Sequence, residues 1–279
     1  MARDKIGIIG GSGFVGYSLA QFLCRNFDIR ILDVRPPTSP NGNIDFVNCD
    51  VRVLQDVEEC LKDLDFVLHT AIVQIPRITE QKRIGYEVNF TGTQNVCEAV
   101  DENLRIKGMI LASSWHTIGE RGVKGVIDEE FGFRPDKVED RARLYALSKI
   151  AQECTVRFFD EMSDRVFGII RMGTVLGADM PVGTAADVFI EKGLRGEAMT
   201  VFRHSMYRPM LYVDIDDVCR AFERFLLKIL NKELDREDQS QVHIFNVCSP
   251  KPTTILDLAE IVRRIILELT RGEICPKIT

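Results

Sequence analysis

The feature that most constrains the fold of this 279-residue chain is a glycine pattern near its start. An apolar, isoleucine-rich run over residues 5–9 is followed by Gly10, Gly13 and Gly16. This pattern predicts a strand, a tight turn and the start of a helix. Gly10 would let the chain leave the strand, Gly13 would let a ligand approach the backbone, and Gly16 would let helix and strand pack closely. Because a helix N-terminus presents unpaired N–H groups, the pyrophosphate of a dinucleotide is the expected occupant; a purely structural turn is the alternative.

Two acidic residues follow at positions where a dinucleotide would need them. A second predicted strand, over residues 29–33, ends in Asp33, whose carboxylate would bind the adenosine ribose and repel a 2′-phosphate. This predicts NAD rather than NADP, with Arg35 as the group that would weaken the preference by reaching a phosphate. A short strand over residues 44–48 leads to Asp50, which we expect to hold the adenine amino group.

Composition restricts the class of protein. A chain with 45% hydrophobic residues can bury one large core, or a core with an appended lobe. Its net charge of −6 gives no basic footprint, so we expect neither nucleic acid nor an anionic membrane as a partner. The eight cysteines are scattered without a CxxC pair, which predicts reduced core thiols in a cytoplasmic protein, and we expect no metal site. No run approaches the roughly eighteen apolar residues of a membrane span.

Strand patterns alternate with helical patterns along the chain, which predicts an α/β fold: a doubly wound parallel sheet, or Rossmann fold, covered on both faces. The cofactor-binding part is expected over residues 1–172 and 211–246, with a small discontinuous substrate lobe over 173–210 and 247–279. Further strands are expected at 66–71 and 107–114. Helices are expected at 13–25, 54–61, 80–103, 141–159 and 254–270.

The second candidate site is the carboxyl edge of this sheet, where ligands of open α/β sheets bind. The strand over 107–114 delivers Ser113 and Ser114 to that edge. Tyr145 and Lys149 stand four residues apart on a predicted helix, so they share a face, and the ammonium group would lower the pKa of the phenol to give a usable base. The alternative is an ordinary surface pair. His69, at a strand end, is expected to be packed and hydrogen-bonded rather than catalytic.

Together these motifs resemble the extended short-chain dehydrogenase/reductases, the nucleotide-sugar epimerase and dehydratase group. The resemblance rests on the three glycines, Asp33, the run from Asn89 to Thr93, Ser114, and the Tyr145 and Lys149 pair, and it continues through residues 171–177 and 207–217. It implies that Tyr145 is the general base, that Lys149 binds the nicotinamide ribose and tunes Tyr145, and that Ser114 hydrogen-bonds the reacting oxygen.

The resemblance also implies binding roles. Arg208 would clamp a nucleotide diphosphate, and Arg203 would assist it unless it belongs to a solvated loop. The implied cofactor-binding residues are Gly10, Gly13, Phe14, Val15, Gly16, Asp33, Asp50, Val51, Ala71, Asn89 and Lys149.

Two departures from the family pattern bear on the reaction. Family dehydratases carry an acidic residue directly after the position of Ser114, whereas this chain has Trp115 and His116, so we do not expect a dehydratase. The Ser-Ser-Trp-His run is instead similar to that of uronate and related free-sugar dehydrogenases, in which case His116 would touch substrate; an ordinary loop histidine is the alternative. The chain also ends soon after the helix over 254–270, which predicts a small lobe or a shortened chain.

Three functions are therefore carried forward. The leading one is an NAD-dependent nucleotide-sugar epimerase of carbohydrate metabolism that works through a transient keto intermediate. The second is an NAD-dependent free-sugar dehydrogenase of the uronate or aldose type. The third is a non-catalytic NAD-binding sensor or scaffold, against which the intact Tyr145, Lys149 and Ser114 argue. We also expect a homodimer, because both helices 80–103 and 141–159 are too apolar to face water all round.

Overall fold

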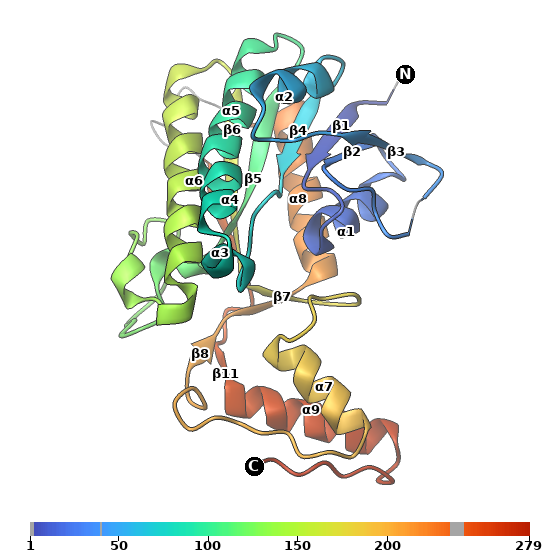
Figure 1. Ribbon diagram of the computed structural model, residues 1–279, viewed down its shortest axis with the longest axis vertical. Coiled ribbons are helices and arrows are strands. Elements are labelled where there is room, and N and C mark those ends of the chain that lie inside the picture. The colour runs from blue at the N-terminus through green and yellow to red at the C-terminus, as the bar shows by residue number, and fades with distance from the viewer. Residues whose placement is uncertain (1–2, 40, 235–242) are drawn as a thin grey trace. The chain divides into compact units, whose positions relative to one another are not determined.

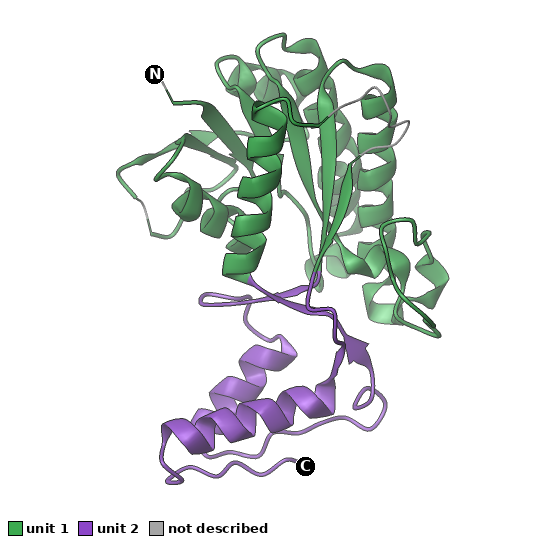
Figure 2. Ribbon diagram, turned by 180° about the vertical axis from the view of Figure 1, so that it is seen from behind, with its two compact units in different colours: residues 1–172, 215–247 green, residues 173–214, 248–279 purple. Residues whose placement is uncertain are grey.

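The computed structural model describes residues 3–39, 41–234 and 243–279, and the chain divides into two compact units (Figure 2). Unit 1 comprises residues 1–172 and 215–247, and unit 2 comprises residues 173–214 and 248–279. The sequence placed the return to the first unit at residue 211 and the departure from it at 247. The structure resumes unit 1 at Ile215, where helix α8 begins.

Unit 1 contains a seven-stranded sheet in the order β10-β6-β5-β4-β1-β2-β3, with every neighbouring pair parallel. The winding changes direction between β1 and β4, which makes a topological switch point at the carboxyl edge. The predicted doubly wound α/β fold is confirmed. The strands are β1 (Lys5–Ile9), β2 (Asp28–Asp33), β3 (Ile44–Asn48), β4 (Phe66–His69), β5 (Gly108–Ser114), β6 (Val166–Met172) and β10 (Ile244–Val247).

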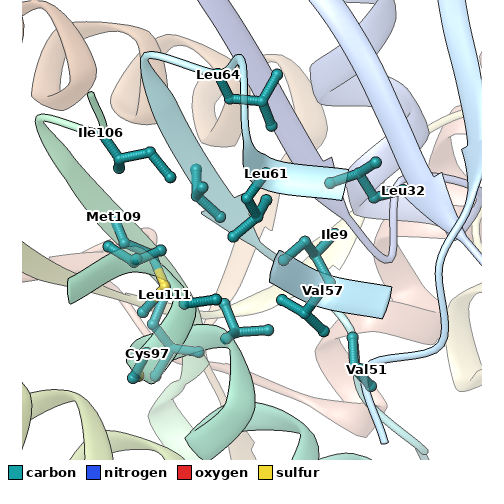
Figure 3. Close-up of a cluster of buried hydrophobic side chains, with 14 of the residues drawn as sticks. Ile9, Leu32, Val51, Val57, Leu61, Leu64, Cys97, Ile106, Met109 and Leu111 are labelled. Carbon is teal, nitrogen blue, oxygen red and sulfur yellow. The ribbon is translucent and has the colours of Figure 1, made fainter. Parts of the chain in front are cut away.

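Helices cover both faces of this sheet (Figure 1). On one face α2 (Leu54–Leu61), α5 (Gly92–Glu102) and α6 (Arg143–Met162) pack side by side. On the other face α1 (Phe14–Leu23) packs against α8 (Ile215–Leu230). Figure 3 shows the core beneath the first set of helices. In it, side chains from the sheet such as Ile9 and Leu111 meet Leu61 of α2 and Cys97 of α5, all of them fully buried.

The helix predicted over residues 80–103 is wrong in one respect, because it is not continuous. The structure has α3 (Arg77–Glu80), α4 (Lys82–Tyr86), a π-helical turn η1 (Glu87–Thr91) and then α5. A π-turn inserts a residue into the helix and is typical of functional sites. Here the buried side chain of Asn89, within the π-turn, hydrogen-bonds the backbone of Val73, which ties this turn to the segment after β4. The periodicity of apolar residues in the sequence cannot reveal hydrogen bonds between residues as far apart as Asn89 and Val73.

Unit 2 is built on two packed helices, α7 (Ala185–Leu194) and α9 (Ile255–Leu269). Thr184 and Thr254 cap their N-termini, the latter in a reciprocal capping box with Asp257. Two short ladders complete the unit. β7 (Thr174–Leu176) pairs in parallel with β9 (Tyr212–Asp214), and β8 (Pro209–Met210) pairs antiparallel with β11 (Thr253–Thr254).

Membrane spans, metal sites and cysteines can each be described for the residues that the structure covers. No helix in this part of the chain is long and apolar enough to cross a membrane. Nor does any group of His, Cys, Asp or Glu there have the arrangement of a metal site. All eight cysteines, each in a described segment, are free thiols. The expectation that they lie in the core is wrong for Cys154 and Cys275, which are exposed.

Candidate active site

The glycine turn between β1 and α1 has the predicted geometry. Gly10 has a φ of 77°, and a Cβ placed on it would lie 2.5 Å from the backbone nitrogen of Ala71. A Cβ on Gly16 would lie 2.4 Å from the Gly10 carbonyl oxygen, so both positions exclude a side chain. Gly13 differs, because it is exposed and a Cβ there would meet only the Gly10 oxygen, at 3.3 Å. The turn therefore leaves an open cradle at Gly13, followed by Phe14 and Val15 in the first turn of α1.

Asp33, the last residue of β2, lies beside this cradle. Its two carboxylate oxygens accept hydrogen bonds from the backbone nitrogens of Ser12, at 3.2 Å, and Arg35, at 3.3 Å. The carboxylate is thus held at the rim of the glycine turn, as a ribose ligand requires. The Arg35 residue is exposed, and the bond described here comes from its backbone rather than its guanidinium group.

Asp50 and Val51 follow β3 and are held by neighbours within the protein. The Asp50 carboxylate pairs with Arg52, with 2.6 Å between Oδ2 and Nη2, and this hydrogen bond lowers the pKa of Asp50. The Val51 carbonyl oxygen accepts a hydrogen bond of 2.8 Å from Asn95 of α5. The structure therefore keeps Asp50 ionised at neutral pH, while its role toward an adenine ring stays a prediction.

Asn89 is fully buried, and its amide is used within the protein. Its Oδ1 accepts a hydrogen bond from the backbone nitrogen of Val73, at 2.7 Å, and its Nδ2 donates to the Val73 carbonyl oxygen and to Ser148 Oγ. Both amide hydrogens are thereby engaged. Asn89 positions the segment after β4, in which Ala71 borders Gly10, rather than presenting a free donor to a cofactor.

The predicted catalytic side chains come together at the carboxyl end of β5. Ser114 Oγ lies 3.1 Å from His116 Nδ1, and the His116 ring meets the Tyr145 ring edge-on with 5.8 Å between their centres. Burial raises the pKa of Tyr145 to about 12, while a hydrogen bond between its hydroxyl and the Ser114 side chain acts in the opposite direction. Ser114, His116 and Tyr145 thus form one continuous polar group at the sheet edge.

Lys149 lies one helical turn beyond Tyr145 and is only 2% exposed. Its Nζ donates a hydrogen bond of 2.6 Å to the carbonyl oxygen of Ala112 on β5. Burial lowers the pKa of Lys149 to about 7, and the carboxylate of Glu153 opposes that effect. The expectation that Lys149 lowers the phenol pKa is wrong, because burial raises the pKa of Tyr145 and the ammonium group of Lys149 is directed to Ala112.

A buried ion pair behind this site was missed by the sequence reasoning. Glu153 on α6 and Arg171 on β6 form a bidentate pair, and Ser113 Oγ donates a 2.5 Å hydrogen bond to the same carboxylate. One signal was available, since Glu153 stands four residues after Lys149 and therefore on the face that already carries Tyr145 and Lys149.

His69 is packed and hydrogen-bonded, as expected. It is fully buried, its Nε2 lies 3.0 Å from Thr93 Oγ1, and burial lowers its pKa to about 3. Gln152 of α6 donates to the same Thr93 oxygen at 2.7 Å, which joins β4, α5 and α6 beneath the site. A histidine with this pKa is neutral at any physiological pH and does not exchange protons there.

Arg203 and Arg208 belong to unit 2. Arg208 immediately precedes β8, its backbone nitrogen donates to the Ser205 carbonyl oxygen at 3.0 Å, and its side chain is partly buried. Burial raises the pKa of nearby Tyr212 to about 12, and the positive charge of Arg208 opposes this. Arg203 lies in the same loop and is exposed. The two arginines therefore differ in exposure, since Arg208 is partly buried and Arg203 is exposed.

The doubly wound sheet, the glycine turn and the group formed by Ser114, Tyr145 and Lys149 define an extended short-chain dehydrogenase/reductase. The model of the NAD dependent epimerase/dehydratase family matches residues 6–248, and the chain belongs to that family. NAD is accordingly its cofactor. The residues present fit this group, because the cradle at Gly13 is open while Gly10 and Gly16 exclude side chains, and because Asp33 stands at its rim.

Similar proteins of known name are dehydrogenases and epimerases. Over 153 residues, 53% of this chain and 38% of the relative, the chain is 32% identical to a human protein named sterol-4-alpha-carboxylate 3-dehydrogenase, decarboxylating. It is 26% identical to a D-erythronate dehydrogenase of Haemophilus influenzae, over 80% of this chain and 67% of the relative. The match thus spans well under half the length of the sterol dehydrogenase.

Among solved structures, the fold is similar to that of a UDP-glucose 4-epimerase from Thermotoga maritima, with a TM-score of 0.78 at 21% identity, covering 99% of this chain and 85% of that one. A UDP-N-acetylglucosamine 4-epimerase from Methanobrevibacter ruminantium gives a TM-score of 0.78 at 22% identity, covering 100% and 86% of the two chains. At these identities the likeness shows the fold alone.

Proposed function

We propose that this protein is an NAD-dependent epimerase-type enzyme that oxidises and then re-reduces a secondary alcohol of a nucleotide-diphosphate sugar through a transient keto intermediate. The observation that carries this proposal is that Tyr145, Ser114 and the buried Lys149 come together at the carboxyl end of β5. The oxidation of an alcohol needs an acid–base group, a hydroxyl group that orients the substrate, and a cation. Here the cation is the ammonium group of Lys149, whose pKa is about 7.

Each residue has a distinct task in this proposal. Tyr145 removes the proton from the substrate hydroxyl and returns it in the reverse step, while Ser114 holds the reacting oxygen through its hydroxyl group. When bound, NAD supplies the acceptor and donor of hydride. Lys149 binds the nicotinamide ribose hydroxyls through its ammonium group. Gly13 and Asp33 hold the pyrophosphate and the adenosine ribose respectively.

Arg208 supports a nucleotide diphosphate as the substrate handle. A guanidinium group binds phosphate oxygens in bidentate fashion, and one held partly buried loses less side-chain entropy on binding than one free in solvent. Several solved structures of similar fold are named as UDP-sugar epimerases. Those names agree with a nucleotide-diphosphate substrate, but the proposal does not depend on them.

A second function is favoured by a specific observation, the pairing of His116 with Ser114 and Tyr145. An imidazole at this position is suited to bind a substrate carboxylate beside the reacting alcohol. The two relatives described above are dehydrogenases, and their names include a sterol carboxylate and D-erythronate respectively. In this alternative the protein is an NAD-dependent dehydrogenase of a free sugar acid, and reducing equivalents leave the enzyme with each turnover.

One experiment separates the two functions. The protein is incubated with NAD and, in separate reactions, with UDP-, GDP- and dTDP-sugars and with free uronates and aldonates, and NADH absorbance and product are both followed. The proposal predicts conversion of a nucleotide sugar without net NADH, since an epimerase returns its hydride within one turnover. Stoichiometric NADH with a free sugar acid, together with no turnover of any nucleotide sugar, would replace the first function by the second.

The two arginines of unit 2 give a matched pair of variants for the same assay. Arg208→Ala is expected to raise KM for the nucleotide sugar by about tenfold or more, while NAD affinity is unchanged, because a charge-assisted contact to the substrate alone is lost. Arg203→Ala, in the same loop but exposed, is expected to change KM much less. Equal effects of both variants would contradict a specific diphosphate clamp at Arg208.

A further inference from the structure

The buried ion pair between Glu153 and Arg171 is unusually complete. Arg171 Nε lies 3.1 Å from each oxygen of the Glu153 carboxylate, and Nη2 lies 2.9 Å from Oε2. The two side chains are 0% and 1% exposed. Replacing such a pair by apolar residues of similar volume is often neutral or stabilising, because removing two charges from water is costly. Its presence in this core therefore calls for a reason other than stability.

Neighbouring groups complete the hydrogen bonding of the pair. Ser113 Oγ donates to Glu153 Oε1, and Arg171 Nη1 donates to the carbonyl oxygen of Glu129 at 3.3 Å. The face of the Phe133 ring lies 5.5 Å from the guanidinium carbon of Arg171. Both charged groups are thus fixed from several elements of unit 1, which leaves the carboxylate little freedom to move.

The hydrogen-bonded group of Glu153, Arg171 and Ser113 adjoins the proposed active site at Lys149 and at Ser114. Glu153 stands one helical turn after Lys149 on α6, and its negative charge opposes the effect of burial on Lys149. Ser113 lies between Ala112, whose carbonyl oxygen accepts the hydrogen bond of Lys149, and Ser114, which is hydrogen-bonded to Tyr145. Glu153 therefore acts on the lysine through its charge and on the end of β5 through Ser113.

We propose that Glu153 and Arg171 are positioning residues: Arg171 fixes a partly neutralised carboxylate one helical turn from Lys149, and the pair thereby controls the charge of Lys149. The inference rests on the proposed function only for its consequence in turnover. A lysine balanced between its two protonation states can bind the ribose as a cation and also pass on a proton, whereas an uncompensated carboxylate would keep it permanently charged.

Other groups around Lys149 do not offset the effect of burial on its pKa. His69 on β4 is neutral, with a pKa of about 3, and burial raises the pKa of Tyr145 on α6 to about 12. His116 of η2 (Trp115–Ile118) contacts Ser114 and Tyr145. Asn89 of η1 and Thr93 of α5 are uncharged. On β6 the charged group is Arg171 itself, and Glu153 is the group whose charge raises the pKa of Lys149.

The test is a pH titration of Lys149 in the NAD-free protein, followed by the carbon-13 shift of the lysine ε-carbon, with Lys149→Met assigning the signal. The wild-type midpoint is expected near 7. Glu153→Gln is expected to lower it by about one pH unit or more, because the raising charge is lost and Arg171 is left unpaired. Arg171→Met is expected to raise it by about one unit, because the carboxylate is no longer neutralised.

Two further variants separate charge from packing. Arg171→Lys keeps the positive charge and is expected to leave the midpoint near that of the wild type, although it loses the bidentate geometry. Asp63→Asn is the control at the opposite edge of the sheet, where Asp63 pairs with Lys5 and Arg30. It is expected to lower stability without moving the Lys149 midpoint.

Opposite shifts in Glu153→Gln and Arg171→Met support the proposal. Shifts in the same direction, or an unmoved midpoint in both variants, overturn it and leave the pair a structural support only. Where a single variant does not fold, the double variant Glu153→Gln/Arg171→Met, which leaves no unpaired charge, takes its place. Its midpoint is expected below that of the wild type, and an unchanged midpoint overturns the proposal. Because no substrate enters the titration, failure of the substrate panel leaves this result intact.

Discussion

Unit 1 builds its two candidate ligand-binding regions in different ways. The glycine half, which comprises β1, α1, β2 and β3, presents backbone atoms at an open turn and the Asp33 carboxylate, which backbone N–H groups hold. The buried half, which comprises β4, β5, β6 and α6, relies on side chains that are removed from water, such as Lys149, Glu153 and Arg171. Backbone geometry therefore determines the structure of the first region, and buried charged side chains determine that of the second. We expect the two regions to respond differently to substitution and to pH.

The largest expected effect lies in the buried half. Tyr145→Phe removes only a hydroxyl group, so the fold and NAD affinity are expected to persist while turnover falls by about a hundredfold or more, the usual worth of a positioned acid–base group. Steady-state rates on a verified substrate and NAD binding by calorimetry provide the measurement. Lys149→Met is the comparison, because it is expected to damage both quantities. Wild-type turnover in Tyr145→Phe would show that another group is the base.

In the glycine half, Gly10 is expected to matter for stability and Gly13 for NAD binding. Gly10→Ala is expected to lower the free energy of unfolding by about 1–3 kcal/mol, because the φ of 77° and the contact with Ala71 oppose a side chain. Gly13→Ala meets no such crowding, so it is expected to retain most stability and to weaken NAD binding instead. Urea unfolding and NAD titration of both variants measure this. Undiminished NAD binding in Gly13→Ala would contradict the prediction that the pyrophosphate of NAD binds at this turn.

The dependence on acid is expected to come from the buried half. His69 has a native pKa of about 3, below the usual 6.5, so the unfolded chain binds the proton more readily and stability falls as pH decreases through this range. From pH 7 to pH 5 the loss is about 2 kcal/mol. His69→Gln is expected to lose less over that interval, as measured by urea unfolding. An identical loss would assign the acid sensitivity to other groups.

Cofactor choice tests the Asp33 carboxylate of the glycine half. Wild-type protein is expected to bind NAD more tightly than NADP by about tenfold or more, and Asp33→Ala to narrow that difference, because one charge-assisted contact and one repulsion are lost. Dissociation constants for both cofactors provide the measurement. Arg35→Ala is the control for a phosphate-binding guanidinium group. Equal affinity for the two cofactors in the wild type would contradict the assignment of Asp33.

The smallest effect is expected on the outer surface of α4 and α6. Exposed apolar side chains gather on α4 and α6: Tyr86, Leu144, Leu147, Phe158 and Met162. Because water-exposed apolar groups of this number favour association, we expect a homodimer through these helices. Light scattering at micromolar concentration tests it, with Phe158→Asp expected to weaken association. Phe202→Asp, at an equally exposed residue of unit 2, is the control. A mass of 31.7 kDa for the wild type would refute the dimer.

Predictions from the sequence succeeded where the determinants are local. The strand, turn and helix around Gly10 follow from residue types and backbone preferences alone, and the alternation of strands and helices was enough to predict the doubly wound sheet. The helix carrying Tyr145 and Lys149 was predicted over 141–159 and spans Arg143–Met162. The break at η1 was missed, because it depends on a contact between Asn89 and Val73 rather than on periodicity.

The sequence by itself therefore determined the fold class, the position of the glycine turn and the shared face of Tyr145 and Lys149, since each depends on residues close together in the chain. Only the tertiary structure decided which charges these groups meet. Ser113 and Glu153 are 40 residues apart, and Glu153 and Arg171 are 18 apart, yet folding joins them in a site closed to water. Because burial and nearby charge set a pKa, the raised pKa of Tyr145 and the lowered pKa of Lys149 emerge only with that assembly.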